Sequence, residues 1–205
     1  MKRTTSAGLM VALLVSACLV ACASQPIEVR EYVLTATASS GPSSIAGRDL
    51  AIGVGPVIVP RYLRRSEIVT RVGANELRAS DTHRWGEVLD RGLARVVAEN
   101  LAVLVSATQV GSYPWRDSAP MNYRVSIDVQ RFERTSDGTV VLEAGWAVHQ
   151  DLEANAFVRR KASIVEEVGS SDYAAAVGAM SRAAARLSQE IAVAIRKDAG
   201  RAATD

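Results

Sequence analysis

Cysteine is scarce in this chain of 205 residues: there are two, Cys18 and Cys22, and both lie near the N-terminus. The rest of the chain therefore cannot be held together by a disulfide framework. Stability must come from an ordinary hydrophobic core, which a mature chain of about 180 residues can form as a single domain.

An excess of charge of one sign is also lacking. Lys2 and Arg3 are the only charged residues before Cys22, and the rest of the chain carries 22 basic and 22 acidic residues. A protein that binds nucleic acid normally shows a basic excess. We therefore expect no nucleic-acid partner.

Common signatures of catalysis and cofactor binding are missing: the sequence has no H-E-x-x-H, no phosphate-loop glycine pattern and no C-x-x-C. Gly53-Val54-Gly55 is followed by Pro56 and no helix opens there, so we interpret it as a turn. The two histidines, His83 and His149, support an envelope hydrolase only as a minor hypothesis, because no nucleophile signature accompanies them. The prediction is a protein without catalytic residues, metal ligands or cofactor.

The N-terminus does contain a secretion signal. Two basic residues precede an apolar stretch from Gly8 to Val20, and small residues stand just before a cysteine. The apolar run is shorter than the ~20 residues that a membrane-spanning helix needs. We therefore predict that residues 1–21 are a signal peptide that is cleaved.

The sequence Leu19-Val20-Ala21-Cys22 resembles a lipobox, which makes the thiol of Cys22 the predicted lipidation site. Val15-Ser16-Ala17-Cys18 is a looser match, and a plain secretory signal is a further alternative. Each methylene of an acyl chain such as palmitate contributes ~0.8 kcal/mol when it is buried in a membrane, so two or more chains anchor a protein stably. Residues 22–29 would then form a short lipidated tether.

Alternating and apolar patterns predict strands and two helices in the remaining chain. Strands are expected at residues 30–35, 50–54, 57–59, 67–71, 75–79, 123–132, 139–149 and 156–165, with hairpin turns at Gly73-Ala74 and Asp137-Gly138. Helices are expected at 85–104, capped by Asp81 or Thr82, and at 172–195. The predicted fold class is α/β, a single domain over residues 30–196 with a mixed, mostly antiparallel sheet and two long helices packed on it. Residues 197–205 are expected to form a disordered tail.

The segment from Pro60 to Arg71 stands out because it combines a proline, a tyrosine and four arginines. Arginine and tyrosine are enriched at the energetic centres of protein interfaces. A basic connector whose arginines face water explains the composition equally well, and the residues alone leave both interpretations open.

Several motifs in order along the chain resemble the ABC-type transport auxiliary lipoproteins typified by PqiC. The resemblance covers nearly the whole mature chain, and the motifs that carry it are the lipobox, Tyr32-Val33-Leu34, Ile52-Gly53-Val54-Gly55-Pro56-Val57, Pro60-x-Tyr62-Leu63, Ile68-Val69-x-Arg71, Trp85, Tyr113-Pro114-Trp115, Tyr123-Arg124-Val125, Arg131-Phe132, Trp146 and the closing helix from Tyr173 to Ile195.

The resemblance implies a non-catalytic subunit of an MCE/ABC-type intermembrane lipid transport system. Such a lipoprotein would face the periplasm from the outer membrane and dock a PqiB-like MCE-domain protein. Ala23 agrees with outer-membrane sorting, because no aspartate follows the lipidated cysteine. The partner-binding residues would be Pro60, Tyr62, Leu63, Arg64, Arg71 and Trp85.

If the MCE partner is a ring, a homo-oligomeric ring of the lipoprotein would match it, although the sequence does not fix the number of subunits. The alternative function is a lipoprotein activator or assembly factor of another envelope machine, such as a cell-wall synthase.

Overall fold

The computed structural model describes residues 28–39, 49–114, 121–150 and 158–201. The predicted signal peptide, both cysteines and residues 202–205 lie outside these ranges. The described part contains two long helices, α2 (Leu89–Val105) and α3 (Tyr173–Arg201), and a short 3-10 helix, η1 (Arg61–Leu63). Its eight strands are β1 (Arg30–Tyr32), β2 (Ala51–Ile58), β3 (Glu67–Arg71), β4 (Leu77–Trp85), β5 (Gln109–Ser112), β6 (Tyr123–Thr135), β7 (Thr139–Gln150) and β8 (Val158–Glu167).

All eight strands belong to one mixed sheet, which confirms the predicted α/β class. Strand β6 lies at its centre: β7 pairs along one edge, and β2 and then β3 pair along the other. The longest ladders, β6 with β7 and β7 with β8, are antiparallel. The pairs β1–β4, β2–β5, β2–β6 and β3–β6 are parallel.

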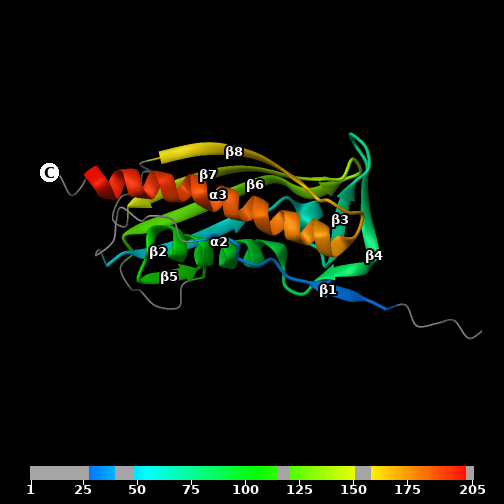
Figure 1. The fold of residues 1–205 in the computed structure, drawn as a ribbon, viewed down its shortest axis with the longest axis horizontal. Coiled ribbons are helices and arrows are strands. Elements are labelled where there is room, and N and C mark those ends of the chain that lie inside the picture. The colour runs from blue at the N-terminus through cyan, green and yellow to red at the C-terminus, as the bar shows by residue number, and fades with distance from the viewer. Residues whose placement is uncertain (1–27, 40–48, 115–120, 151–157, 202–205) are drawn as a thin grey trace, which may run out of the picture.

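Both long helices lie side by side on the same face of the sheet (Figure 1). The sequence of β6 explains this one-sided packing, because Tyr123, Val125, Ile127 and Val129 are buried while Arg124 and Asp128 between them are exposed. Successive side chains of a strand point to opposite faces, so β6 presents one apolar and one polar face. We call the face without α2 and α3 the open face.

An extended segment after β1, residues 33–38, runs over the two helices. The backbone N–H of Thr35 donates to the hydroxyl of Ser181 on α3 at 3.1 Å. The side-chain oxygen of Asn100 on α2 accepts from the N–H groups of Thr37 at 3.1 Å and Ala38 at 2.9 Å. Leu34, between these anchors, is buried in the core. The segment therefore joins the core although it is not a strand of the sheet.

Replacing Asn100 with alanine should lower the free energy of unfolding by about 1–3 kcal/mol, because two backbone donors would lose a buried acceptor. Urea denaturation measures this loss, and hydrogen exchange at Thr37 and Ala38 should become faster in the variant. Glu99→Ala is the matched control, since this neighbour is exposed and should change stability by less than about 0.5 kcal/mol. Unchanged exchange at Thr37 and Ala38 would contradict the assignment.

Both predicted hairpins are confirmed, but the predicted start of the first helix is wrong. Trp85 is the last residue of β4, where it pairs with Tyr32 of β1, and its N–H donates to the carbonyl of Ser66 at 2.6 Å. Helix α2 begins only at Leu89, after Val88, and neither Asp81 nor Thr82 caps it. Strand pairing with distant residues thus overrides an apolar spacing that is typical of a helix.

The strand predicted to end before Gly55-Pro56 instead continues through this pair to Ile58 as β2, so the turn interpretation is wrong. Its register with β6 shifts between Val54 and Val57. Gly55 has a φ of 131°, and a Cβ at this position would lie 2.4 Å from the Cβ of Tyr113. Glycine is therefore required here by the close approach of the segment that follows β5.

The closing helix extends beyond its predicted end at Ile195, and residues 197–201 are helical instead of disordered. Ala199 is buried. The Asp198 carboxylate accepts hydrogen bonds from the Tyr123 hydroxyl at 3.0 Å and from the Gln150 amide at 2.8 Å. These contacts hold the last turns against the ends of β6 and β7. None of the described helices is long and apolar enough to cross a membrane.

Candidate docking site

A buried acid, Glu133 on β6, organises the surroundings of the arginine-rich segment 60–71. Its side chain is fully buried, and its carboxylate accepts from the Tyr62 hydroxyl at 2.7 Å, from Arg71 Nε at 2.7 Å and from Arg131 Nε at 3.0 Å. The backbone N–H of Phe132 adds a fourth bond at 3.1 Å. A buried carboxylate is tolerated only when such donors compensate for its lost hydration.

The electrostatics of this cluster follow from the same contacts. Burial alone would raise the pKa of Glu133, but hydrogen bonds from Arg71, Tyr62 and Arg131 outweigh it, and the pKa lies below its usual value. Burial and the hydrogen bond to Glu133 raise the pKa of Tyr62 to about 12. Its hydrogen bond with Glu133 also raises the pKa of Arg71. The cluster therefore has an ionised acid, a neutral tyrosine and charged arginines at neutral pH.

The segment before β3 turns sharply across the open face. Pro60 precedes η1, and its carbonyl accepts the N–H of Leu63 at 3.0 Å. Leu63 is buried in the core, and its packing holds the turn in place. Arg64 Nε donates to the carbonyl of Val59 at 3.1 Å, but the residue remains exposed. Arg61 is also exposed and makes no ion pair with any described residue.

The structure brings all six predicted partner-binding residues into one region, with different environments. Leu63 and Trp85 are buried, so they support the site from inside and offer no surface to a partner. Tyr62 and Arg71 are partly buried and directed at Glu133. Pro60 is partly exposed, and Arg64 is exposed. We call the stretch of chain that presents Arg61, Tyr62, Arg64 and Arg71 at the surface the docking segment.

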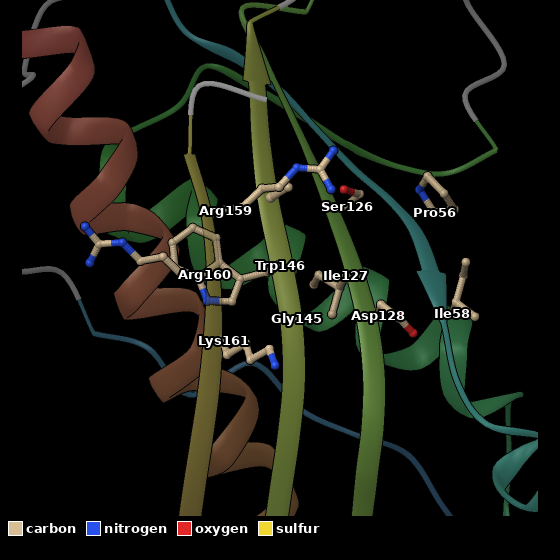
Figure 2. A pocket seen from close by; sticks show the side chains of 11 residues that line it. Pro56, Ile58, Ser126, Ile127, Asp128, Gly145, Trp146, Arg159, Arg160 and Lys161 are labelled. Atoms are coloured by element: carbon tan, nitrogen blue, oxygen red, sulfur yellow. The ribbon is translucent and has the colours of Figure 1, made fainter. Parts of the chain in front are cut away.

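A hollow of about 590 Å³ lies on the open face and reaches β2 just before the docking segment. Pro56 and Ile58 on β2 and Gly145 and Ala147 on β7 form its apolar part. Figure 2 shows Arg159 and Lys161 of β8 extending over this face, while the side chain of Arg160 is directed to the other side of the sheet, toward α3. Ile58 is 49% exposed at the margin of this hollow.

The histidines do not form a reactive pair. His83 Nδ1 lies 2.9 Å from the Tyr32 hydroxyl, and its ring stacks on Tyr173 with 4.1 Å between centroids. His149 lies near the end of β7, in register with Arg124 of β6. Thus His83 links β1, β4 and α3 through ring contacts, and among the described residues no serine or threonine hydroxyl is hydrogen-bonded to either ring.

The sequence interpretation missed Glu133 and Arg131. Both lie on an alternating strand, where acids and bases on the polar face are normally solvated. Phe132 is buried toward the helices, so Glu133 points to the open face, where the side chains of Tyr62 and Arg71 bond to it. Only the tertiary fold reveals that this acid is buried.

Comparison with protein families gives a match over most of the chain. A model described as "ABC-type transport auxiliary lipoprotein component" matches residues 32–192. No curated protein matches the chain.

Solved structures share the fold at low sequence identity. A Xanthomonas campestris protein of the family DUF330 has a TM-score of 0.69 and 17% identity, over 85% of this chain and 99% of that chain. A second protein, described only as uncharacterized, has a TM-score of 0.68 and 18% identity, over 82% of this chain and 99% of that chain. PelC from Paraburkholderia phytofirmans, solved as a dodecamer, has a TM-score of 0.42 and 14% identity, over 75% of this chain and 92% of that chain. The last likeness is too weak for that assembly to bear on this chain.

Proposed function

Because the chain belongs to the family of ABC-type transport auxiliary lipoprotein components, we propose that it is the outer-membrane docking subunit of an MCE-type intermembrane lipid transport system. In this proposal Cys22 carries the lipid, the domain faces the periplasm, and the docking segment binds the MCE-domain protein. The family is one of transport auxiliary components and not of enzymes, which agrees with a binding role.

The observation that carries the proposal is the way in which Glu133 holds the docking segment. Tyr62 and Arg71 are bonded to a buried carboxylate on the central strand, so the backbone between them is fixed before any partner arrives. Arg61 and Arg64 remain exposed on this fixed turn. A preorganised surface loses less conformational entropy on binding, and exposed arginines provide directional donors to partner carboxylates or carbonyls.

Charge reversal at Arg61 and Arg64 tests the docking segment without disturbing the buried cluster. The double variant Arg61→Glu, Arg64→Glu should reduce recovery of the MCE protein by about tenfold or more. The introduced glutamates would repel the partner carboxylates that the arginines are proposed to bind. The measurement is co-purification from crosslinked cells, quantified against the lipoprotein itself. Arg91→Glu is the matched control, since Arg91 is an exposed arginine of α2 and lies outside the docking segment.

Two outcomes would count against this assignment. Normal recovery of the MCE protein with the double variant would mean that the docking surface lies outside the docking segment. Recovery of a cell-wall synthase or a different exporter, with no MCE protein, would favour the activator hypothesis. Mass measurement of the purified complex tests whether several copies assemble as a ring around the partner.

A further inference from the structure

Strand β8 forms one edge of the sheet, and its two halves differ in what bonds to their outward backbone groups. Among the described strands it pairs with β7 alone. At its C-terminal half, α3 closes the outer edge: Arg186 donates to the carbonyl of Val165 at 3.2 Å, and Arg182 donates to the carbonyl of Glu167 at 2.6 Å. Backbone groups of alternate residues point to the same edge of a strand. The outward groups of the N-terminal half therefore belong to Arg159, Lys161 and Ser163, and no described residue bonds to them.

The open half of this edge also carries positive charge that no described acid pairs with. Arg159, Arg160 and Lys161 are consecutive and exposed, and none forms an ion pair with a described residue. The arginines of α3 differ, because Arg182 and Arg186 both pair with Glu166 at 3.1 Å. Figure 2 places Arg159 and Lys161 on the open face and Arg160 on the opposite side. A strand added here would meet a cation on each of its faces.

We infer that the N-terminal half of β8 is a docking edge for an extended, acidic segment of a partner protein, which adds to the sheet as its next strand. Main-chain hydrogen bonds to residues 159–163 would provide affinity, as in other cases of strand addition. Arg159, Arg160 and Lys161 would select acidic side chains through cross-strand pairs.

The same charges argue against a second copy of this chain as the occupant. Lysine and arginine on an edge strand discourage pairing with an identical edge, because like charges would face each other. An acidic strand is attracted by the same residues. The single acid that lines the neighbouring hollow, Asp128, lies two strands away on β6.

The position of this edge suits a protein partner. Strand β8 begins at the end of the molecule opposite to β1, from which the chain continues toward residue 22 (Figure 1). A domain that is anchored through Cys22 would therefore expose the beginning of β8 away from its membrane. This orientation rests on the proposed lipid anchor, whereas the binding measurements below do not.

Peptide binding to the full-length lipoprotein in neutral detergent tests the inference. The probe is a fluorescent ten-residue peptide of alternating glutamate and valine, and its partner probe has lysine in place of glutamate. Fluorescence anisotropy should show saturable binding of the acidic peptide and binding of the basic one that is weaker by about tenfold or more. The double variant Arg159→Glu, Lys161→Glu should reverse this preference, while Lys197→Glu on α3 should leave it unchanged.

Strand addition is separated from simple charge attraction by removing donors. Ser163→Pro deletes one outward N–H while leaving the three cations and the bonds to β7 in place, and proline is compatible with edge strands at such positions. The Ser163→Pro variant should bind the acidic peptide with an affinity about tenfold lower than the unaltered protein does. An acidic peptide that is N-methylated at alternate residues should bind the unaltered protein with a similarly reduced affinity. This second measurement does not depend on how the proline variant folds. Equal binding of the methylated and unmethylated peptides, or of the acidic and basic peptides, would overturn the inference.

Discussion

The variant Glu133→Ala should lose about 3–5 kcal/mol of the free energy of unfolding, a loss typical of breaking a buried ion pair. The carboxylate is fully buried and accepts from the side chains of Tyr62, Arg71 and Arg131 and from the N–H of Phe132. Its removal leaves these four donors without their partner and a cavity in the covered part of the open face. Urea denaturation followed by circular dichroism measures the change. Arg65→Ala removes an exposed ion pair with Glu67 and should cost only about 0–1 kcal/mol.

The pH dependence of stability provides an independent test of the same residue. Because the folded protein lowers the pKa of Glu133 below 4.5, its ionised form stabilises the fold fully above that value. This contribution disappears as the pH falls through the folded pKa. The stability difference between the unaltered protein and Glu133→Gln should therefore shrink in acid. A difference that stays constant from neutral pH to about pH 3 would contradict the assigned ionisation.

Cys22→Ser should move the protein from the membrane fraction to the soluble fraction, which is the largest effect expected of any single substitution in this chain. Each acyl chain contributes ~0.8 kcal/mol per buried methylene, and two or more chains give effectively stable anchoring. No described helix could replace that anchor by crossing the membrane. Cell fractionation and metabolic labelling with palmitate measure the result.

Cys18→Ser is the matched control, because it alters the neighbouring cysteine within the predicted signal peptide. It should leave both labelling and membrane attachment intact. If Cys18→Ser abolishes labelling while Cys22→Ser retains it, the weaker lipobox is the functional one. An unmodified protein in the soluble fraction, with both cysteines present, would remove the basis for a lipid-anchored docking subunit.

Local patterns predicted the local parts of the fold. Strict alternation along Tyr123–Phe132 and the Asp137-Gly138 turn were sufficient to predict the β6–β7 hairpin, since both signals lie within a short stretch of chain. The parallel pairs of β2 with β5 and β6 could not be read in this way. They join residues far apart in sequence, and β5, with the sequence Gln-Val-Gly-Ser, has no apolar alternation to reveal it.

The site shows the same division between local and distant signals. Composition drew attention to the segment from Pro60 to Arg71, but it could not separate residues that support the turn from residues that face outward. That distinction depends on Glu133, which is 62 residues from Arg71. The open half of β8 was equally hidden, because Arg159 to Lys161 resemble any solvated strand until the bonds from α3 to Val165 and Glu167 are seen.

The hydrogen bond between Thr35 and Ser181 joins residues that are 146 positions apart. The segment of residues 33–38 therefore cannot form its native contacts until the last helix, α3, is present. The predicted signal peptide implies that the chain is exported N-terminus first. The N-terminal end would then stay at the membrane, without its contacts to α3, while nearly all of the remaining sequence passes through the translocation channel. Apolar strands stay uncovered during that interval, and such species aggregate readily. We expect biogenesis of this lipoprotein to depend on periplasmic chaperones more strongly than that of a protein whose contacts are mainly local.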